Sequence, residues 1–303
     1  MDRRGSATDG ADGTGEAPPD ADGDDDAAAV GMEGTWRPED VPEMLPDRAA
    51  VIDADGPVDA LDYAADVRDA AALDAAAAAD HVDHLASVVR ETTGDSRAAA
   101  AEALDLIGRR RPSTLAVWTD DLVALAADAD PAAAAAGLRA LVRLAEADPA
   151  AAAAGAGTAV DAAGATDARR RPALRLVAAL AEADPEHVPD ADRVVAAAMA
   201  DADAGVRTAG ALCAASVLAA APGTFPRTAT GLFELLDDAD ADVRAGAHLA
   251  LVRFARDHPE QVPEKRAAVE ALGRASDADL DLAPGATKDA LTALLEVAHG
   301  YSF

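Results

Sequence analysis

The sequence predicts an all-α protein, built as a solenoid of about six stacked helical hairpins. Three observations carry this prediction. Prolines recur 36 or 37 residues apart, apolar residues keep fixed distances from them, and each copy holds two segments of helical periodicity joined by a turn. Because hairpins of this kind pack only against their neighbours, a chain of 303 residues needs no single large core.

The repeat is defined by Pro112, Pro149, Pro185, Pro222 and Pro259. Four apolar columns lie three and ten residues after each proline, and five and eight residues before it. In that order, the columns contain Leu115, Ala152, Val188, Phe225 and Val262; Leu122, Ala159, Val195, Leu232 and Val269; Ile107, Leu144, Leu180, Val217 and Phe254; and Leu104, Leu141, Val177, Ala214 and Leu251. We expect all four columns to face the core.

The clearest copy, residues 222–263, shows what one unit contains. Its first segment carries apolar residues at helical spacing, which are Leu232, Phe233, Leu235 and Leu236. The acidic run 237–242 then interrupts the pattern. Because Asp is a poor interior helix residue and a good N-cap, this run predicts a turn that starts a second helix. The ring of Pro259 clashes with a continuing helix, so the second helix must end just before it.

The N-terminal segments differ from the repeats. Residues 1–31 hold nine acidic residues against Arg3 and Arg4, and we expect a disordered acidic tail. Residues 32–57 mix apolar residues with four prolines. They predict an extended arm on the first repeats, with Trp36 as its anchor, or a linear motif for another protein.

The solenoid itself is predicted over residues 58–303. It begins with a capping half-repeat at 58–78, whose inward residues include Leu73, followed by a helix at 80–92. It ends with a helix at 287–298, after an insertion at 276–285. In the third copy Gly155 and Gly157 fall inside a helical segment, where each costs up to ~1 kcal/mol relative to Ala. They predict either very close packing or a soft hinge.

A polar column adds a family resemblance. Fifteen residues before the proline stands Arg97, Arg170, Arg207 or Arg244, with Ala134 in the remaining copy. A turn Asp followed by this Arg, as in Asp203-Ala-Gly-Val-Arg207 and Asp240-Ala-Asp-Val-Arg244, resembles the HEAT-repeat pattern over about residues 60–300. The unit is a little shorter than the roughly 40 residues of that family, and Arg169, Arg170 and Arg171 together depart from it. The resemblance implies a right-handed α-solenoid of HEAT-like hairpins whose second helices line the concave face.

The formal net charge of −30 constrains the environment and the partners. Basic residues are almost all Arg, since Lys265 and Lys288 are the only lysines. This acidic, lysine-poor composition resembles that of proteins from salt-loving archaea, where molar salt screens repulsion between carboxylates; an acidic protein from a GC-rich genome is the alternative. Cys213 is the only cysteine, which fits a reducing cytoplasm, and no apolar stretch reaches the ~18 residues of a membrane span.

Chemical sites are weakly indicated. His81 and His84 could share a helix face, but zinc needs three or four ligands, and two surface histidines are the simpler interpretation. The acidic turns lack the Gly and Glu of a calcium loop, and helix capping explains them. HEAT-like deoxyhypusine hydroxylases carry His-Glu pairs, whereas no His here precedes Glu. Motifs of bilin lyases or of a helical-repeat DNA glycosylase are missing, and no cofactor or small-molecule substrate is evident.

The predicted function is therefore a cytoplasmic, non-catalytic scaffold that binds a segment of an unidentified protein partner on its concave face, where we expect the second helices to lie. The candidate contacts form an arginine-lined groove for an acidic segment, and they are Arg139, Arg143, Arg175, Arg207, Arg244 and Arg253. The competing interpretation pairs these arginines with turn aspartates and neighbouring acids, for example Arg207 with Asp203 or Asp240. A HEAT-scaffold enzyme or maturation factor is the alternative function. Nucleic-acid binding comes third, because phosphate binding needs a basic stripe that the net charge disfavours.

Overall fold

The computed structural model describes residues 45–46, 60–275 and 282–299. All of the described residues belong to one compact unit of the chain. The predicted tail and most of the predicted arm, Trp36 included, lie outside the described residues. Within the arm, Leu45 is half-buried and packs against the core. The tail and arm assignments therefore remain predictions.

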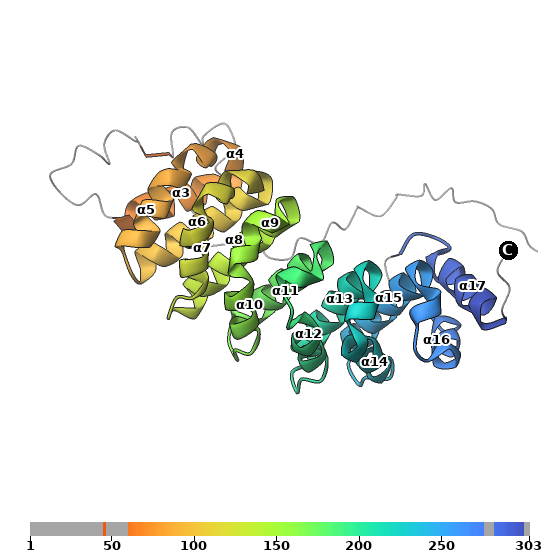
Figure 1. Ribbon diagram of the computed structural model, residues 1–303. Helices are drawn as coiled ribbons and strands as arrows, with labels where there is room; N and C mark the ends of the chain where they lie inside the picture. The colour runs from red at the N-terminus through yellow and green to blue at the C-terminus, as the bar shows by residue number, and fades with distance from the viewer. Residues whose placement is uncertain (1–44, 47–59, 276–281, 300–303) are drawn as a thin grey trace, which may run out of the picture. The chain divides into compact units, whose positions relative to one another are not determined.

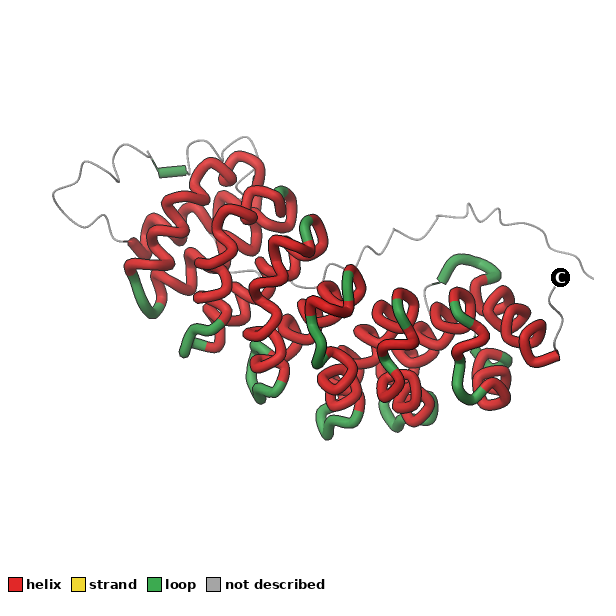
Figure 2. Tube along the Cα trace, in the orientation of Figure 1, coloured by secondary structure: helices red, strands yellow, loops and turns green. Residues whose placement is uncertain are grey.

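The described residues form helices, turns and no β-strand, which confirms the all-α prediction (Figure 2). A leading helix, α3 (Ala60–Leu73), precedes six hairpins. The first helices of the hairpins are α5 (Val82–Glu91), α7 (Thr119–Ala126), α10 (Ala156–Ala163), α12 (Ala191–Met199), α14 (Pro226–Leu235) and α16 (Lys265–Leu272). The second helices are α6 (Asp95–Arg110), α8 (Pro131–Ala147), α11 (Arg170–Ala183), α13 (Ala204–Ala220), α15 (Ala241–Asp257) and α17 (Ala286–His299).

Short helices complete the connections between and within hairpins. Two are the α-helical turns α4 (Ala75–Ala78) and α9 (Pro149–Ala152). The others are the 3₁₀ turns η2 (Ala79–His81), η3 (Pro112–Trp118), η4 (Ala153–Gly155), η5 (Pro185–His187), η6 (Pro222–Thr224) and η7 (Pro259–Gln261). Each repeat proline is the first residue of one of these turns. The N–H that proline lacks would have no partner within the turn at that position, and the fixed φ of proline already suits a helical turn. The second helices accordingly end two residues before the proline, as predicted for Pro259.

The leading helix and the second helices pack side by side in one row, in the order α3, α6, α8, α11, α13, α15 and α17 (Figure 1). Each first helix packs against the second helix of its own hairpin, so the first helices form an adjoining row. This stacking of hairpins confirms the solenoid.

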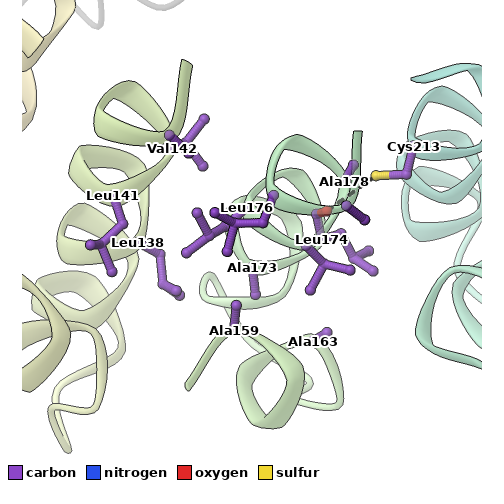
Figure 3. Close-up of a cluster of buried hydrophobic side chains, with 14 of the residues drawn as sticks. Leu138, Leu141, Val142, Ala159, Ala163, Ala173, Leu174, Leu176, Ala178 and Cys213 are labelled. Atoms are coloured by element: carbon purple, nitrogen blue, oxygen red, sulfur yellow. Dashed lines mark hydrogen bonds between the residues drawn. The ribbon is translucent and has the colours of Figure 1, made fainter. Parts of the chain in front are cut away.

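All members of the four apolar columns are buried except Val269, which is half-buried and packs against the core. Figure 3 shows one section of this core, where side chains of α8, α10 and α11 meet. The leading helix departs from the expected pattern. Leu73, predicted to face inward, is 37% exposed, and the buried positions of α3 include Tyr63 and Ala64. Val67 is buried, in agreement with the prediction that Val67 or Arg68 faces inward. Leu73 is the last residue of α3, and the chain turns away there into α4.

Hairpin helices cross closely at a column of small residues twelve positions before each proline, which comprises Ala100, Gly137, Ala173, Gly210 and Ala247. A Cβ atom on Gly137 would lie 2.8 Å from the backbone nitrogen of Ala126, and one on Gly210 would lie 2.8 Å from that of Met199. Both positions therefore require glycine, because backbone cannot move aside cheaply. In the third copy, a Cβ on Gly155 would lie 3.0 Å from Leu141, whereas nothing lies within 4 Å of one on Gly157. Of the two glycines, only Gly155 therefore shows the close packing that was one of the two predictions for this segment.

Candidate partner-binding surface

Three turns between first and second helices share an Asp-Ala-Asp geometry, at residues 128–130, 201–203 and 238–240. In each, the first Asp accepts a hydrogen bond from the backbone N–H of the second, at 2.8, 2.8 and 2.9 Å. The second Asp caps the following helix. Asp240, for example, accepts from the backbone N–H groups of Asp242 and Val243, at 2.9 and 3.2 Å. These bonds satisfy amide donors that a helix start leaves unpaired, which confirms the capping role predicted for the acidic run 237–242. The acidic turn at 277–281 lies outside the described residues.

The first Asp of each turn also bonds an arginine from the preceding repeat. Three ion pairs result, which we term the arginine ladder: Arg97–Asp128 at 2.6 Å, Arg170–Asp201, and Arg207–Asp238 at 2.8 Å. The partner of Arg207 is therefore Asp238, whereas the sequence suggested Asp203 or Asp240. Those two carboxylates cap their own helices, and the arginine side chain extends forward to the turn of the next repeat.

The ladder shifts the acidity of its carboxylates. The Arg207 guanidinium and the N–H of Asp240 hold the pKa of Asp238 below its usual value. The N–H of Asp203, followed by Arg170, lowers the pKa of Asp201 in the same way.

Arg244 occupies the ladder position of the fifth hairpin, and it donates to the backbone oxygens of Asp238 and Ala239 at 2.7 and 2.9 Å. Among the described residues it makes no ion pair, because Ala275 stands where the next turn aspartate would be. A cavity of about 440 Å³ lies beside it, lined in part by His248 and Arg274. Of the six candidate arginines, Arg207 and Arg244 thus lie at the turns and bind backbone there.

The other four candidates lie on a different surface, which we call the outer face. It comprises the positions ten, six and three residues before the proline on α6, α8, α11, α13 and α15. In helix order, these are Glu102, Leu106 and Arg109; Arg139, Arg143 and Glu146; Arg175, Ala179 and Glu182; Leu212, Ser216 and Ala219; and Leu249, Arg253 and Arg256. Every one of these residues is at least partly exposed. Helical spacing and exposure together place them on one stripe of the second-helix row.

Arginines on the outer face share carboxylates. Arg139 of α8 donates to Asp105 of α6 at 2.7 Å, and Arg109 approaches the same carboxylate at 3.7 Å. Glu146 lies 3.4 Å from Arg143 and 3.8 Å from Arg175 of the next helix. Because one carboxylate serves two arginines in each group, positive charge is left over between α6 and α11.

Two further arginines extend this charge. Arg253 of α15 is exposed and makes no ion pair within the described part of the chain. On α11, Arg171 lies one turn before Arg175 and is also exposed and without an ion pair there. The outer face holds six arginines and three glutamates, and Asp105 and Asp257 beside it pair with Arg139 and Arg256. Its local charge is therefore slightly positive, in a chain of net charge −30.

Cys213 and the histidine pair have structural surroundings. Cys213 is buried on α13, and its thiol contacts the carbonyl of Leu174 at 3.3 Å (Figure 3). Burial raises the pKa of the thiol to about 12, so the thiolate is not formed near neutral pH. His81 is only 4% exposed, and its Nδ1 lies 2.9 Å from the hydroxyl of buried Tyr63. The expectation of two surface histidines was therefore wrong for His81, which packs under the leading helix.

Within the described ranges, no three His, Cys, Asp or Glu side chains are placed to hold a metal ion. The same part of the chain contains no helix with the length and apolar character of a membrane span.

Comparisons with known proteins identify the fold and no family. No family model matches the sequence, and no curated protein matches it. Among solved structures, an engineered protein studied by a structural genomics consortium matches with a TM-score of 0.59 and 21% identity, over 71% of this chain and 96% of that one. A designed armadillo-repeat protein, solved in complex with the peptide (KR)4, matches with a TM-score of 0.58 and 16% identity, over 70% and 99%. At these identities the likeness shows a repeat α-solenoid.

Proposed function

We propose that this chain is a non-catalytic protein-interaction scaffold of HEAT type, which binds an acidic segment of a partner on its outer face. The observation that carries the proposal is the charge of that face. Six arginines gather there, most of them with incomplete neutralisation, while the chain as a whole is strongly acidic. Surface arginines present five N–H donors in a fork that suits carboxylates, so a partner carboxylate can complete their bonding.

Of the predicted contacts, Arg139, Arg143, Arg175 and Arg253 are the ones we assign to the partner. Arg207 and Arg244 hold turns, and the proposal gives them a supporting role. A stack of hairpins suits this function because it exposes a long surface that can bind an elongated segment without a deep pocket. The designed armadillo-repeat protein, which was solved in complex with a peptide, supports the idea that a stack of this kind can bind a peptide.

The composition supports a further part of the proposal, namely that the protein works in the cytoplasm of a salt-loving cell. At molar salt the Debye length is about 3 Å, so exposed charges interact only at contact distance. Binding under these conditions requires direct arginine–carboxylate contacts and apolar contacts, rather than long-range attraction.

The test is affinity capture at molar KCl with three proteins compared. The wild-type chain should retain a specific protein that is lost from an Arg139→Gln/Arg175→Gln variant. The matched control is Arg193→Gln, an exposed arginine on α12 in the other helix row. Equal capture by all three proteins would contradict the proposed surface. Capture of nucleic acid, or turnover in an activity screen, would favour one of the alternative functions.

A further inference from the structure

The outer face changes character between α11 and α13. From Thr208 to Ala220, α13 carries no charged residue, although 27% of the chain is charged. Leu212 on this helix is 49% exposed, and it is a large apolar residue at a position where α8 and α11 carry arginine. At the same position on α15, Leu249 is half-buried and packs against the core. The charged part of the face is thus followed by an uncharged part.

One line of residues crosses four neighbouring helices and changes from charged to apolar side chains along its length. We call it the crossing line: Arg139 on α8, Arg175 on α11, Leu212 on α13 and Leu249 on α15. All four stand ten residues before their repeat proline, so they share one register, and each helix packs on the next. Two arginines are therefore followed directly by two leucines across the row.

Resting on the proposed function, we infer that the partner segment is bipartite, with acidic residues over Arg139 and Arg175 and large apolar residues over Leu212 and Leu249. The apolar part would cover Leu212, which is exposed on this uncharged part of the face. The acidic part follows from the shared carboxylates. Asp105 serves Arg139 and Arg109, and Glu146 serves Arg175 and Arg143, so Arg139 and Arg175 both retain N–H donors for a partner carboxylate.

The row geometry sets the spacing within the partner segment. Packed helix axes lie about 8–10 Å apart. The centre of the arginine pair and the centre of the leucine pair are two such steps apart, or roughly 18 Å. An extended chain rises about 3.3 Å per residue, so about five or six residues separate the acidic and apolar groups. This spacing takes the segment as extended.

Four fluorescent peptides test the inference by anisotropy with the full chain. The first carries a pair of acidic residues and a pair of leucines at the spacing above. The second has the same composition with the leucines placed directly beside the acids. The third has serine in place of leucine, and the fourth is a (Lys-Arg)4 peptide. A single-stranded oligonucleotide serves as the nucleic-acid arm.

We expect the first peptide to bind roughly tenfold more tightly than the second and third. Leu212→Ser should remove this preference and leave binding of the third peptide unchanged. Arg139→Gln/Arg175→Gln should weaken all acidic peptides. Leu73→Ser and Arg193→Gln, which change an exposed leucine and an exposed arginine elsewhere, should change nothing. Raising KCl to molar levels should reduce the arginine effect and preserve the leucine effect, since salt screens only charge.

The results separate this inference from the scaffold proposal. If the arginine variant weakens acidic peptides and Leu212→Ser has no effect on the preference, the bipartite segment is wrong and the scaffold proposal stands. If none of the acidic peptides binds, or if the oligonucleotide or the (Lys-Arg)4 peptide binds more tightly, the acidic nature of the segment is overturned. If a protein captured at molar salt is retained equally by the arginine variant, the proposed binding surface fails instead.

Discussion

Arginine has different roles in the turns and on the outer face. At the turns, Arg207 is 18% exposed and bonds one carboxylate and two backbone oxygens, so its donors are committed within the fold. On the outer face, Arg175 is 58% exposed and reaches one carboxylate at 3.8 Å. The difference shows that an arginine's place in the repeat, rather than its presence on a second helix, decides whether it is available to a partner.

The largest expected effect comes from the core on which both regions depend. Phe254 is fully buried, and Phe254→Ala should lower the free energy of unfolding by about 3–5 kcal/mol through lost burial and a cavity. Phe233→Ala is the matched control, because Phe233 is only half-buried and should lose less. Denaturant unfolding at fixed molar KCl measures both. Equal losses would contradict the packing of the fifth hairpin.

A smaller effect is expected at the turn caps. Asp240→Ala removes the acceptor of two backbone N–H groups and should cost about 1 kcal/mol. Asp190→Ala is its control, since Asp190 precedes α12 without capping it through its side chain, and should change stability by less than about 0.5 kcal/mol. The same unfolding measurement compares them. A control as destabilised as Asp240→Ala would show that the caps do not distinguish these turns.

The comparison between the two regions is tested directly by one substitution at two places. Arg207→Gln should destabilise the fold, because it breaks a ladder pair and leaves Asp238 without its guanidinium. Arg175→Gln should change stability by less than about 0.5 kcal/mol, as expected for an exposed pair at long distance. Thermal unfolding of both variants at one salt concentration gives the ranking. The reverse order would mean that the outer face supports the fold and is not free for a partner.

The smallest effect is a pH dependence of the ladder. The pKa of Asp238 is lowered in the folded state from an ordinary value of 3.8. A lowered folded-state pKa contributes stability that is fully present above the unfolded value and is lost as pH falls through the folded value. The stability difference between wild type and Asp238→Asn should therefore be constant above about pH 5 and shrink in more acidic solution. A difference that grows on acidification would contradict the lowered pKa.

Much of the fold could be predicted because the regular spacing of the prolines shows which residues of the repeats correspond. The prolines gave the helix ends, and nineteen of the twenty column residues are buried as expected. The leading helix was harder, since no proline defines its register and Leu73 was assigned to the wrong face. His81 was missed for a related reason. Its burial depends on Tyr63, eighteen residues earlier, which no local pattern connects to it.

The candidate surface was predicted only in part. The sequence placed all six arginines on second helices, but it could not separate Arg207 and Arg244 from the rest. Arg207 bonds Asp238 in the next turn, 31 residues away, and Arg244 bonds the backbone oxygens of Asp238 and Ala239 in the turn before its own helix. The ladder could have been found by comparing each arginine with the residue 31 positions later, which is Asp for Arg97, Arg170 and Arg207. The exposure of Leu212 could not be predicted from the sequence, because a leucine on an apolar helix is expected to be buried in the core.

By itself the sequence determined the helices, their ends and the period of the stack, because proline, aspartate and apolar spacing act on the nearest turns of the chain. Only the tertiary structure decided which side chains share a carboxylate and which remain exposed, because these contacts join residues about one repeat apart. The charge reversal of the outer face and its uncharged continuation over α13 emerge only when the helices lie side by side, and a partner segment would meet them there.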